Sequence, residues 1–178
     1  MVSQLKVNEI IKQSGSSITI GEAGDTVSGP FTNTPAFYAY KTSDQSVSND
    51  SSTKVTFDAE RFDTNSGFDL SNNKFVVPSG QGGKYLISFN LALYDASGDI
   101  FRVLTRLYKN GNLVFMDHVY QDVTSDSYRF YTTKGFDYMD LSAGDYLELY
   151  LYAEMNDSGA ITIQGAPNAG DGKMCYLA

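Results

Sequence analysis

The sequence predicts an all-β domain of about ten short strands that follows an extended N-terminal arm. From about Thr34 onwards, short runs of alternating apolar and polar residues are separated by turn-forming residues. The chain has 16 Gly, 13 Tyr and 11 Phe but only 4 Pro, which is typical of a strand-rich protein with many tight turns. No stretch after residue 34 shows the sustained periodicity of a helix. We therefore expect a sandwich or barrel without a long helix.

The first 33 residues differ from the rest, and we assign them as an attachment arm that precedes a domain spanning residues 34–178. The beginning of this arm could form a short amphipathic helix, which would be marginal on its own. The arm is poor in large aromatic residues, so it cannot bury enough apolar surface to order alone. We expect it to order by binding a neighbouring copy or a larger assembly. The residues expected to make this attachment are Leu5, Val7, Ile10, Ile18 and Ile20.

Two segments of the domain have the clearest strand pattern. The segment 84–94 places five large apolar residues on one face: Tyr85, Ile87, Phe89, Leu91 and Leu93. The segment 146–152 places leucines on one face and, on the other, Glu148 with Tyr146, Tyr150 and Tyr152. Between two other apolar runs, Asn110-Gly111 is a strong signal for a β-hairpin.

The tyrosine stripe on residues 146–152 indicates an interface. Tyrosine suits such a surface because it buries a ring and keeps a polar tip. The alternative is that these tyrosines lie on a solvated sheet face. We interpret the stripe as a surface between copies, and we add Tyr38 and Tyr40 of the opening strand to the predicted interface.

The net charge of −8 argues against nucleic acid as a partner, because phosphate binding needs clustered Lys and Arg. No apolar run approaches the roughly 20 residues that a membrane span needs, and the N-terminus has no pattern of a secretory signal. We therefore expect a soluble chain without membrane insertion.

Many carboxylates fall in expected turns: Asp95, Asp99, Asp122, Asp126, Asp157 and Asp171. The simpler interpretation is a solvated acidic surface, and the alternative is a weak divalent-cation site at these acidic loops. No other cofactor is expected. The single cysteine, Cys175, cannot form an intramolecular disulfide, and we interpret it as a small buried side chain.

The sequence has no pattern that favours catalysis. His118 is the only histidine, and it lies in an alternating segment that is typical of an ordinary strand. There is no Cys/His cluster for zinc and no phosphate-binding loop. A catalytic pair of carboxylates is not excluded, because a sequence does not show which residues lie close in space, but no Asp or Glu is marked as a candidate. We expect no catalytic residues and no metal ligands.

One series of aromatic residues is specific enough to suggest a family. It runs through Phe57, Asp63, Phe68 and Phe75 to the segment Gly83-Lys84-Tyr85-Leu86-Ile87-Ser88-Phe89, and it resembles the signature of C1q domains. The gap before Gly83 is longer than usual, and Ile87 replaces the usual Phe. Both departures are tolerable, since loops accept insertions and a large apolar side chain is kept. The rings Phe57, Phe68, Phe75, Tyr85 and Phe89 suit the core of a sandwich.

Further landmarks extend this resemblance over about residues 34–178. They include Phe37-Tyr38-Ala39-Tyr40-Lys41, Lys109-Asn110-Gly111, the segment 141–149 and Met174-Cys175-Tyr176-Leu177. The resemblance implies a ten-stranded jelly roll of the C1q/TNF type that assembles as a homotrimer around a threefold axis.

The arm resembles the N-terminal segments of bacteriophage fibre and virion proteins. This resemblance implies a non-enzymatic virion protein, either a capsid decoration or a tail-fibre head. The arm would bind capsid or fibre proteins, and a host surface glycan or protein is a candidate further partner. The alternatives are a secreted or surface bacterial C1q-like lectin or adhesion domain and, from another class, a small jelly-roll hydrolase. Fold alone does not choose among them.

Overall fold

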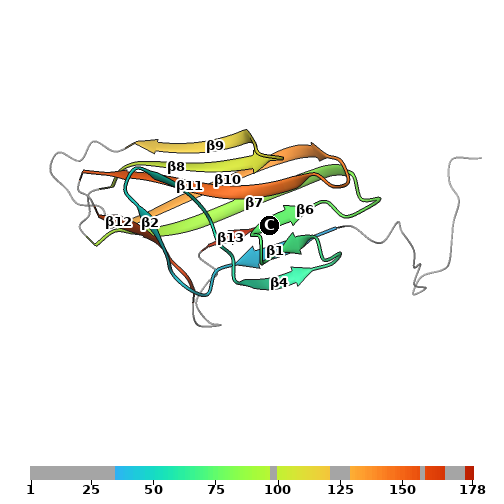
Figure 1. Cartoon of the computed structure of the whole chain (residues 1–178), viewed down its shortest axis with the longest axis horizontal. Coiled ribbons are helices and arrows are strands. Elements are labelled where there is room, and N and C mark those ends of the chain that lie inside the picture. Colours follow the sequence, from blue (N-terminus) through green and yellow to red (C-terminus); the bar gives the residue numbers. More distant parts are fainter. Residues whose placement is uncertain (1–34, 97–99, 121–128, 157–158, 167–174) are drawn as a thin grey trace, which may run out of the picture. The chain divides into compact units, whose positions relative to one another are not determined.

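The computed structural model describes residues 35–96, 100–120, 129–156, 159–166 and 175–178. These residues form two antiparallel β-sheets, of seven and six strands (Figure 1). The residues predicted to make the attachment, from Leu5 to Ile20, lie outside the described residues, as do the loop acids Asp99, Asp122, Asp126, Asp157 and Asp171. Within the described part of the chain, no helix is long and apolar enough to span a membrane.

The first sheet contains the strands β1 (Phe37–Tyr40), β2 (Gln45–Ser48), β4 (Ala59–Asp63), β7 (Gly83–Tyr94), β10 (Phe130–Leu141), β12 (Ala160–Ile163) and β13 (Tyr176–Leu177). The long strand β7 organises this sheet. It pairs with β10 along its whole length on one side, whereas β12 and β13 share its other side. The sheet continues from β13 to β1 and then to β4 at the edge.

The second sheet contains β3 (Ser51–Lys54), β5 (Phe68–Asp69), β6 (Lys74–Val76), β8 (Ile100–Lys109), β9 (Asn112–Tyr120) and β11 (Tyr146–Met155). Here β11 pairs with β8 on one side and with β3 and β6 on the other. The chain passes repeatedly from one sheet to the other: β7 belongs to the first, β8 and β9 to the second, β10 to the first and β11 to the second. This alternation is that of a jelly roll.

The all-β prediction is confirmed, but the number of strands is not ten. The described residues contain thirteen strands, and several of them are only two to four residues long. The short strands β2, β3 and β5 lie in the connection between β1 and β6. Such segments pair for only a few residues, and Ser51–Lys54 has no apolar alternation that could mark it as a strand.

Large rings fill the space between the sheets. Phe57, Phe68, Phe75 and Phe89 are buried, and Phe37 stacks on Phe75 with the ring centres 4.2 Å apart. Tyr85, the fifth ring of the motif, is half-buried, and its hydroxyl donates a hydrogen bond to the carbonyl oxygen of Gln81 at 2.6 Å. Aromatic pairs of this kind contribute beyond the area that they bury.

Cys175 is buried directly before β13. Burial raises the pKa of its thiol to about 11, and its sulfur accepts a hydrogen bond from the backbone N–H of Ala92 at 3.1 Å. A thiol in this environment is a weak nucleophile, because the thiolate is the reactive form.

Lys41 is also buried, with only 2% of its surface exposed. Its Nζ donates to the carbonyl oxygen and the hydroxyl of Thr56, at 2.7 and 3.0 Å. Burial lowers the pKa of Lys41, and the charge of Asp58 partly offsets this effect. The hydrogen bonds give the buried ammonium the partners that it would lose from water.

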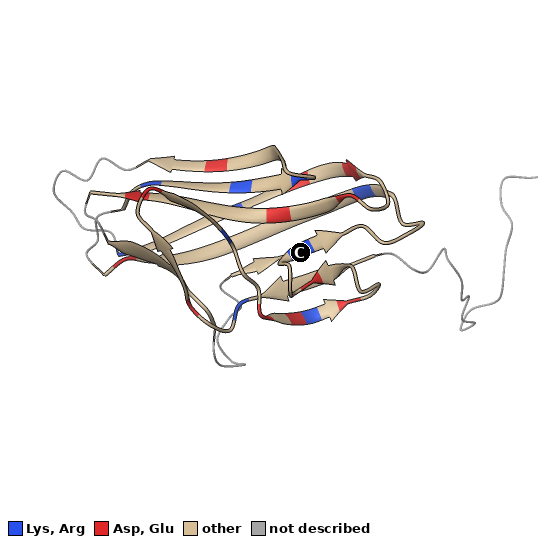
Figure 2. Cartoon of the chain, viewed as in Figure 1, with Lys and Arg blue, Asp and Glu red and all other residues tan. Residues whose placement is uncertain are grey.

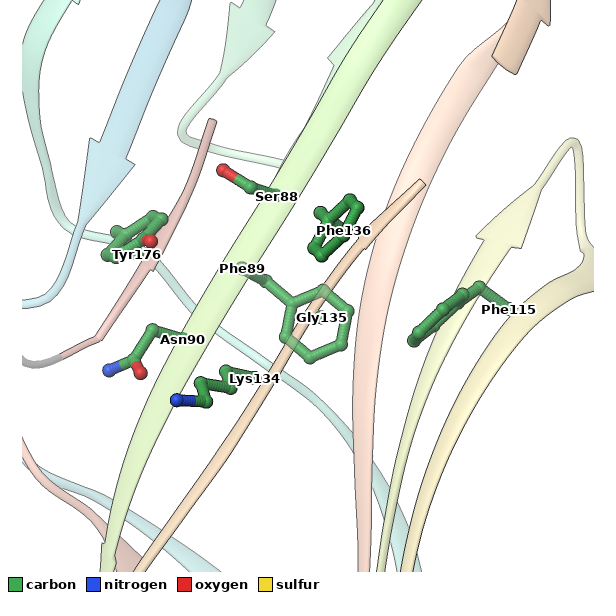
Figure 3. A pocket seen from close by; sticks show the side chains of 8 residues that line it. All are labelled: Ser88, Phe89, Asn90, Phe115, Lys134, Gly135, Phe136 and Tyr176. Atoms are coloured by element: carbon green, nitrogen blue, oxygen red, sulfur yellow. The ribbon is translucent and has the colours of Figure 1, made fainter. Parts of the chain in front are cut away.

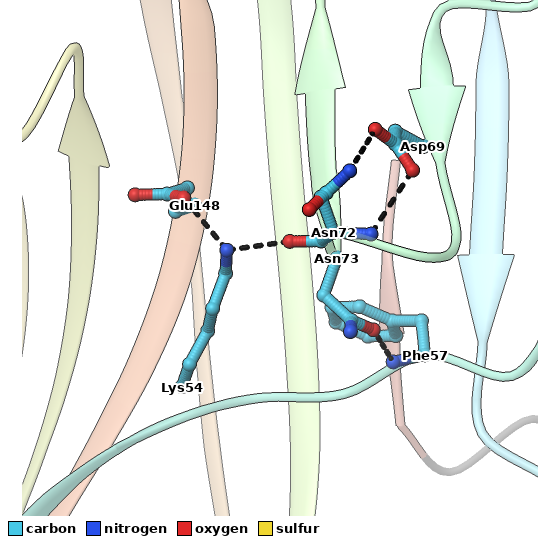
Figure 4. A network of polar contacts seen from close by, with 6 residues as sticks. All are labelled: Lys54, Phe57, Asp69, Asn72, Asn73 and Glu148. Atoms are coloured by element: carbon cyan, nitrogen blue, oxygen red, sulfur yellow. Dashed lines mark hydrogen bonds and ion pairs between the residues drawn. The ribbon is translucent and has the colours of Figure 1, made fainter.

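Polar side chains tie the long connection before β6 to the second sheet (Figure 4). Lys54 forms an ion pair with Glu148 of β11 at 2.6 Å and donates to the carbonyl oxygen of Asn72 at 2.5 Å. The side chain of Asn73 accepts a hydrogen bond from the backbone N–H of Phe57 at 2.6 Å. The hydrogen bond to Asn73 helps to hold Phe57 in place outside a regular strand.

The predicted hairpin joins β8 to β9. Asn110 and Gly111 have positive φ angles of 52° and 77°, as the favoured two-residue hairpin turn requires. The Asn110 side chain donates to Asp145 at 2.7 Å, and Lys109 forms an ion pair with the same carboxylate at 2.8 Å. Hydrogen bonds from Lys109, Ser142 and Asn110 lower the pKa of Asp145 to about 2.

Candidate interaction surface

The outer face of the first sheet carries a row of large apolar side chains. Strand pairing sets Tyr38 beside Phe62, Leu86 beside Tyr138, and Tyr94 beside Phe130. We call the following set the aromatic face: Tyr38, Tyr40, Phe62, Leu86, Tyr94, Phe130, Phe136, Tyr138 and Tyr176. Phe136 and Tyr138 are 69% and 74% exposed, which is unusual for such large side chains. Large exposed apolar side chains that gather on one sheet face make this face a candidate interaction surface.

Ring contacts connect several strands of the aromatic face. Tyr38 of β1 stacks on Tyr176 of β13, with ring centres 4.9 Å apart, and lies 6.1 Å from Phe62 of β4. Tyr94 of β7 lies 4.9 Å from Phe130 of β10. Partial burial raises the pKa of Tyr38, and the neighbouring Tyr176 adds to this effect. The rings therefore hold each other in place on the sheet.

A pocket of about 570 Å³ opens in the aromatic face (Figure 3). The residues that line it are Ser88, Phe89, Asn90, Phe115, Lys134, Gly135, Phe136 and Tyr176. Its size is within the range of small-molecule sites. Strands β7, β9, β10 and β13 all contribute to it.

The pocket forms because β7 turns small side chains outward between larger neighbours. Ser88 pairs with Phe136 of β10, and Asn90 lies between Lys134 of β10 and Tyr176 of β13. Two polar residues of modest size therefore form a trough that larger side chains border.

Gly135 is required at the back of this pocket. A Cβ atom there would lie 2.7 Å from ring carbons of both Phe89 and Phe115, which is too close. These two rings pack edge to face with centres 5.7 Å apart. The missing side chain thus lets the core rings approach β10 and line the pocket.

Among the described residues that line the pocket, Lys134 is the one with a formal charge. The other described lysines have partners: Lys54, Lys84 and Lys109 in ion pairs, Lys41 in hydrogen bonds, and Lys74 over a tyrosine ring. Within the described residues, no carboxylate lies within ion-pair distance of Lys134. This exposed ammonium therefore lies beside apolar rings, and none of the described carboxylates pairs with it.

The predicted interface tyrosines lie on two opposite faces, so the structure does not bring all five together. Tyr38 and Tyr40 belong to the aromatic face, whereas Tyr146, Tyr150 and Tyr152 lie on the outer face of the second sheet. There they have partners within the chain. Lys74 lies over the Tyr146 ring at 5.0 Å, and Tyr108 packs edge to face on Tyr150.

Tyr152 has the densest set of neighbours on this second outer face. Its hydroxyl donates to Asp50 and accepts from Arg102, which forms an ion pair with Glu154 at 2.7 Å. The hydrogen bond to Asp50 raises the pKa of Tyr152. The guanidinium of Arg106 lies 5.4 Å from the centre of the Tyr152 ring. These tyrosines therefore have partners within the chain, and their role in an interface between copies stays a prediction.

The most exposed residues of the aromatic face were not among those predicted from the sequence to form an interface, and they are Leu86, Phe130, Phe136 and Tyr138. The sequence of residues 130–141 does contain a sign of two apolar faces. Phe130, Phe136 and Tyr138 stand at even positions, whereas Met139 and Leu141 stand at odd positions. Lys134 and Gly135 interrupt that pattern. His118, the one histidine, is exposed on β9. No group of three His, Cys, Asp or Glu residues in the described ranges could hold a metal ion.

Many solved structures resemble this chain, and two of them are the globular domain of a complement protein and APRIL. No family model and no curated protein matches the chain. The globular domain of zebrafish complement 1qA protein is 18% identical, with a TM-score of 0.49, and the match covers 72% of this chain and 93% of that one. Murine APRIL at pH 5.0 is 13% identical, also with a TM-score of 0.49, over 71% and 95% of the two chains.

Proposed function

We propose that this chain is a non-enzymatic structural protein whose domain assembles into a homotrimer through the aromatic face. The observation that carries this proposal is the exposure of Phe62, Leu86, Phe130, Phe136 and Tyr138 on one sheet face. Phe and Tyr are enriched where protein surfaces meet, and water-exposed rings gain free energy when a second copy covers them. A stable contact buries roughly 800 Å² on each partner, and a sheet face can supply such an area.

The threefold state is favoured by the resemblance of residues 57–89 to the C1q-domain signature. A closed ring of three copies needs two different complementary patches on each copy. Four further large apolar side chains are exposed on β9, and they could form the second patch: Leu113, Val114, Met116 and Tyr120. A trimer therefore uses both groups of exposed apolar residues.

Assembly is tested by sedimentation velocity and light scattering at micromolar concentration. We expect a particle of three times the chain mass of 19.5 kDa. A clean monomer would overturn the proposal. A dimer would be compatible with the aromatic face as the interface but would overturn the proposal of three copies.

The trimer is proposed to belong to a phage particle, as a capsid decoration or a fibre head, with residues 1–33 as its attachment. Support comes from the resemblance of this arm to virion proteins. Three arms on one trimer would act together, so weak individual contacts could still hold the head firmly. We expect genes for capsid or tail proteins beside the gene for this chain, and the chain itself in purified particles by mass spectrometry. Its absence from particles would overturn the virion assignment and leave the trimer untouched.

A further inference from the structure

The pocket in the aromatic face combines apolar rings with a few polar groups from different strands. Phe136 and Tyr176 border it, and Phe89 and Phe115 line its back. Polar atoms come from Ser88 and Asn90 on β7, from Lys134 on β10 and from the Tyr176 hydroxyl on β13. Small-molecule sites have this composition: a mostly apolar lining with a few polar groups that fix the orientation of the ligand.

The positive charge of Lys134 favours a negatively charged ligand in this pocket. Lys134 has no carboxylate partner among the described residues, although the chain as a whole carries a net charge of −8. A ligand with a single negative charge would supply the missing partner. Charge-assisted hydrogen bonds are stronger than neutral ones, particularly beside apolar groups that exclude water.

Other ligand classes fit this pocket less well. A phosphate group is commonly bound by several backbone N–H groups or clustered cations. Here β7 and β10 pair with each other from Gly83–Leu141 to Tyr94–Phe130, so their backbone groups are engaged in the ladder. A neutral sugar needs many hydrogen-bonding partners, whereas rings dominate this lining.

We propose that this pocket binds a small ligand in which one carboxylate is attached to an apolar body. The carboxylate pairs with Lys134, and Ser88 and Asn90 provide further polar groups beside it. The apolar body lies between Phe136 and Tyr176, over Gly135, which the rings of Phe89 and Phe115 approach closely. Fatty acids and aromatic acids share this chemistry.

The pocket lies within the surface that the proposed trimer would use, so a ligand and a neighbouring copy would compete for it. This consequence rests on the proposed function, whereas the ligand site itself does not. If both are right, a saturating apolar carboxylate shifts the assembly towards smaller species.

The probes for the first experiment are 2-naphthoate and its uncharged analogue 2-naphthamide, titrated into the full-length protein by calorimetry or NMR. We expect the acid to bind about tenfold more tightly than the amide, because only the acid pairs with Lys134. Lys134→Met should remove this difference by weakening the binding of the acid to the level of the amide.

Lys84→Met is the matched control, because Lys84 lies on the same sheet face but already pairs with Asp140 at 2.7 Å. It should leave the binding of both probes unchanged. Equal binding of the acid by wild type and Lys134→Met would overturn the proposal, as would equal loss in both variants. Octanoate in place of naphthoate tells whether an aliphatic body serves as well as an aromatic one.

A second variant, Ser88→Leu, fills the trough and should weaken both probes, with circular dichroism as the test of folding. If wild type binds neither probe at millimolar concentration, the ligand site is overturned, including the case in which a neighbouring copy already fills it. Sedimentation of the same samples without a probe measures assembly separately. A trimer that binds no probe therefore overturns this inference and not the proposed function.

Discussion

The two outer faces of the sandwich use the same residue types in opposite ways. On the second sheet, tyrosines are surrounded by Arg, Lys and carboxylates, and Figure 2 shows charged residues spread along β8 and β11. On the first sheet, several rings contact one another, and Phe62, Phe130, Phe136 and Tyr138 are exposed. A tyrosine stripe is therefore ambiguous in a sequence. The residues on neighbouring strands decide whether the tyrosines have partners within the chain or stay exposed.

The largest expected effect concerns the core, which both faces share. Phe68→Ala should lower the free energy of unfolding by about 3–5 kcal/mol, because its buried ring packs on Phe37 and Phe57. Chemical denaturation measures this loss. A change below about 1 kcal/mol would mean that the Phe68 ring is not part of the core, and the assignment of the aromatic series to the core would then be wrong.

The sharpest test of the comparison is a pair of matched substitutions. Phe136→Asp on the aromatic face should raise the dissociation constant of the assembly by about 100-fold, because the charge would have to be buried between copies. Tyr150→Asp on the opposite face should leave assembly unchanged and lower stability by about 1 kcal/mol through loss of the Tyr108 contact. Sedimentation and denaturation separate the two quantities. The reverse pattern would move the interface to the second sheet.

The ion pairs of the second sheet should make folding sensitive to acid. The pKa of Asp145 is about 2 in the folded chain, against an ordinary value of 3.8. A carboxylate with a lowered pKa contributes stability above its unfolded pKa and loses it as the pH falls through the folded value. Stability should therefore fall between about pH 4 and pH 2, and Asp145→Asn should make this fall shallower. Thermal unfolding at several pH values measures it, and identical pH profiles would contradict the prediction.

The smallest expected effect is that of an exposed ion pair at the margin of the aromatic face. The side chains of Lys84 and Asp140 are 81% and 74% exposed, so solvent screens their attraction. Lys84→Met should change stability by less than about 0.5 kcal/mol. A loss several times larger would indicate that this pair orients β7 against β10, which would make it unsuitable as the control for Lys134→Met.

The sequence by itself determined the strand-rich class, the strands that contain residues 84–94 and 146–152, and the hairpin at Asn110-Gly111. These features follow from local rules, namely the two-residue period of a strand and the positive φ angles of a tight turn. The aromatic series from Phe57 to Phe89 indicated core positions because it resembles the C1q signature and consists of large rings, which gain free energy when they are buried.

Only the tertiary structure decided which apolar residues stay exposed and what gathers around the pocket. Ser88, Lys134 and Tyr176 are far apart in the sequence, and they meet because β7 pairs with β10 on one side and with β13 on the other. In the second sheet, the pairing of β11 with β8 brings Tyr108 against Tyr150. In the first sheet, Phe136 lies opposite the small Ser88 and is 69% exposed. The alternation of apolar and polar residues in a sequence indicates that a strand has two different faces. The packing of distant strands determines which face is covered and by what, and a single sequence does not record that pairing.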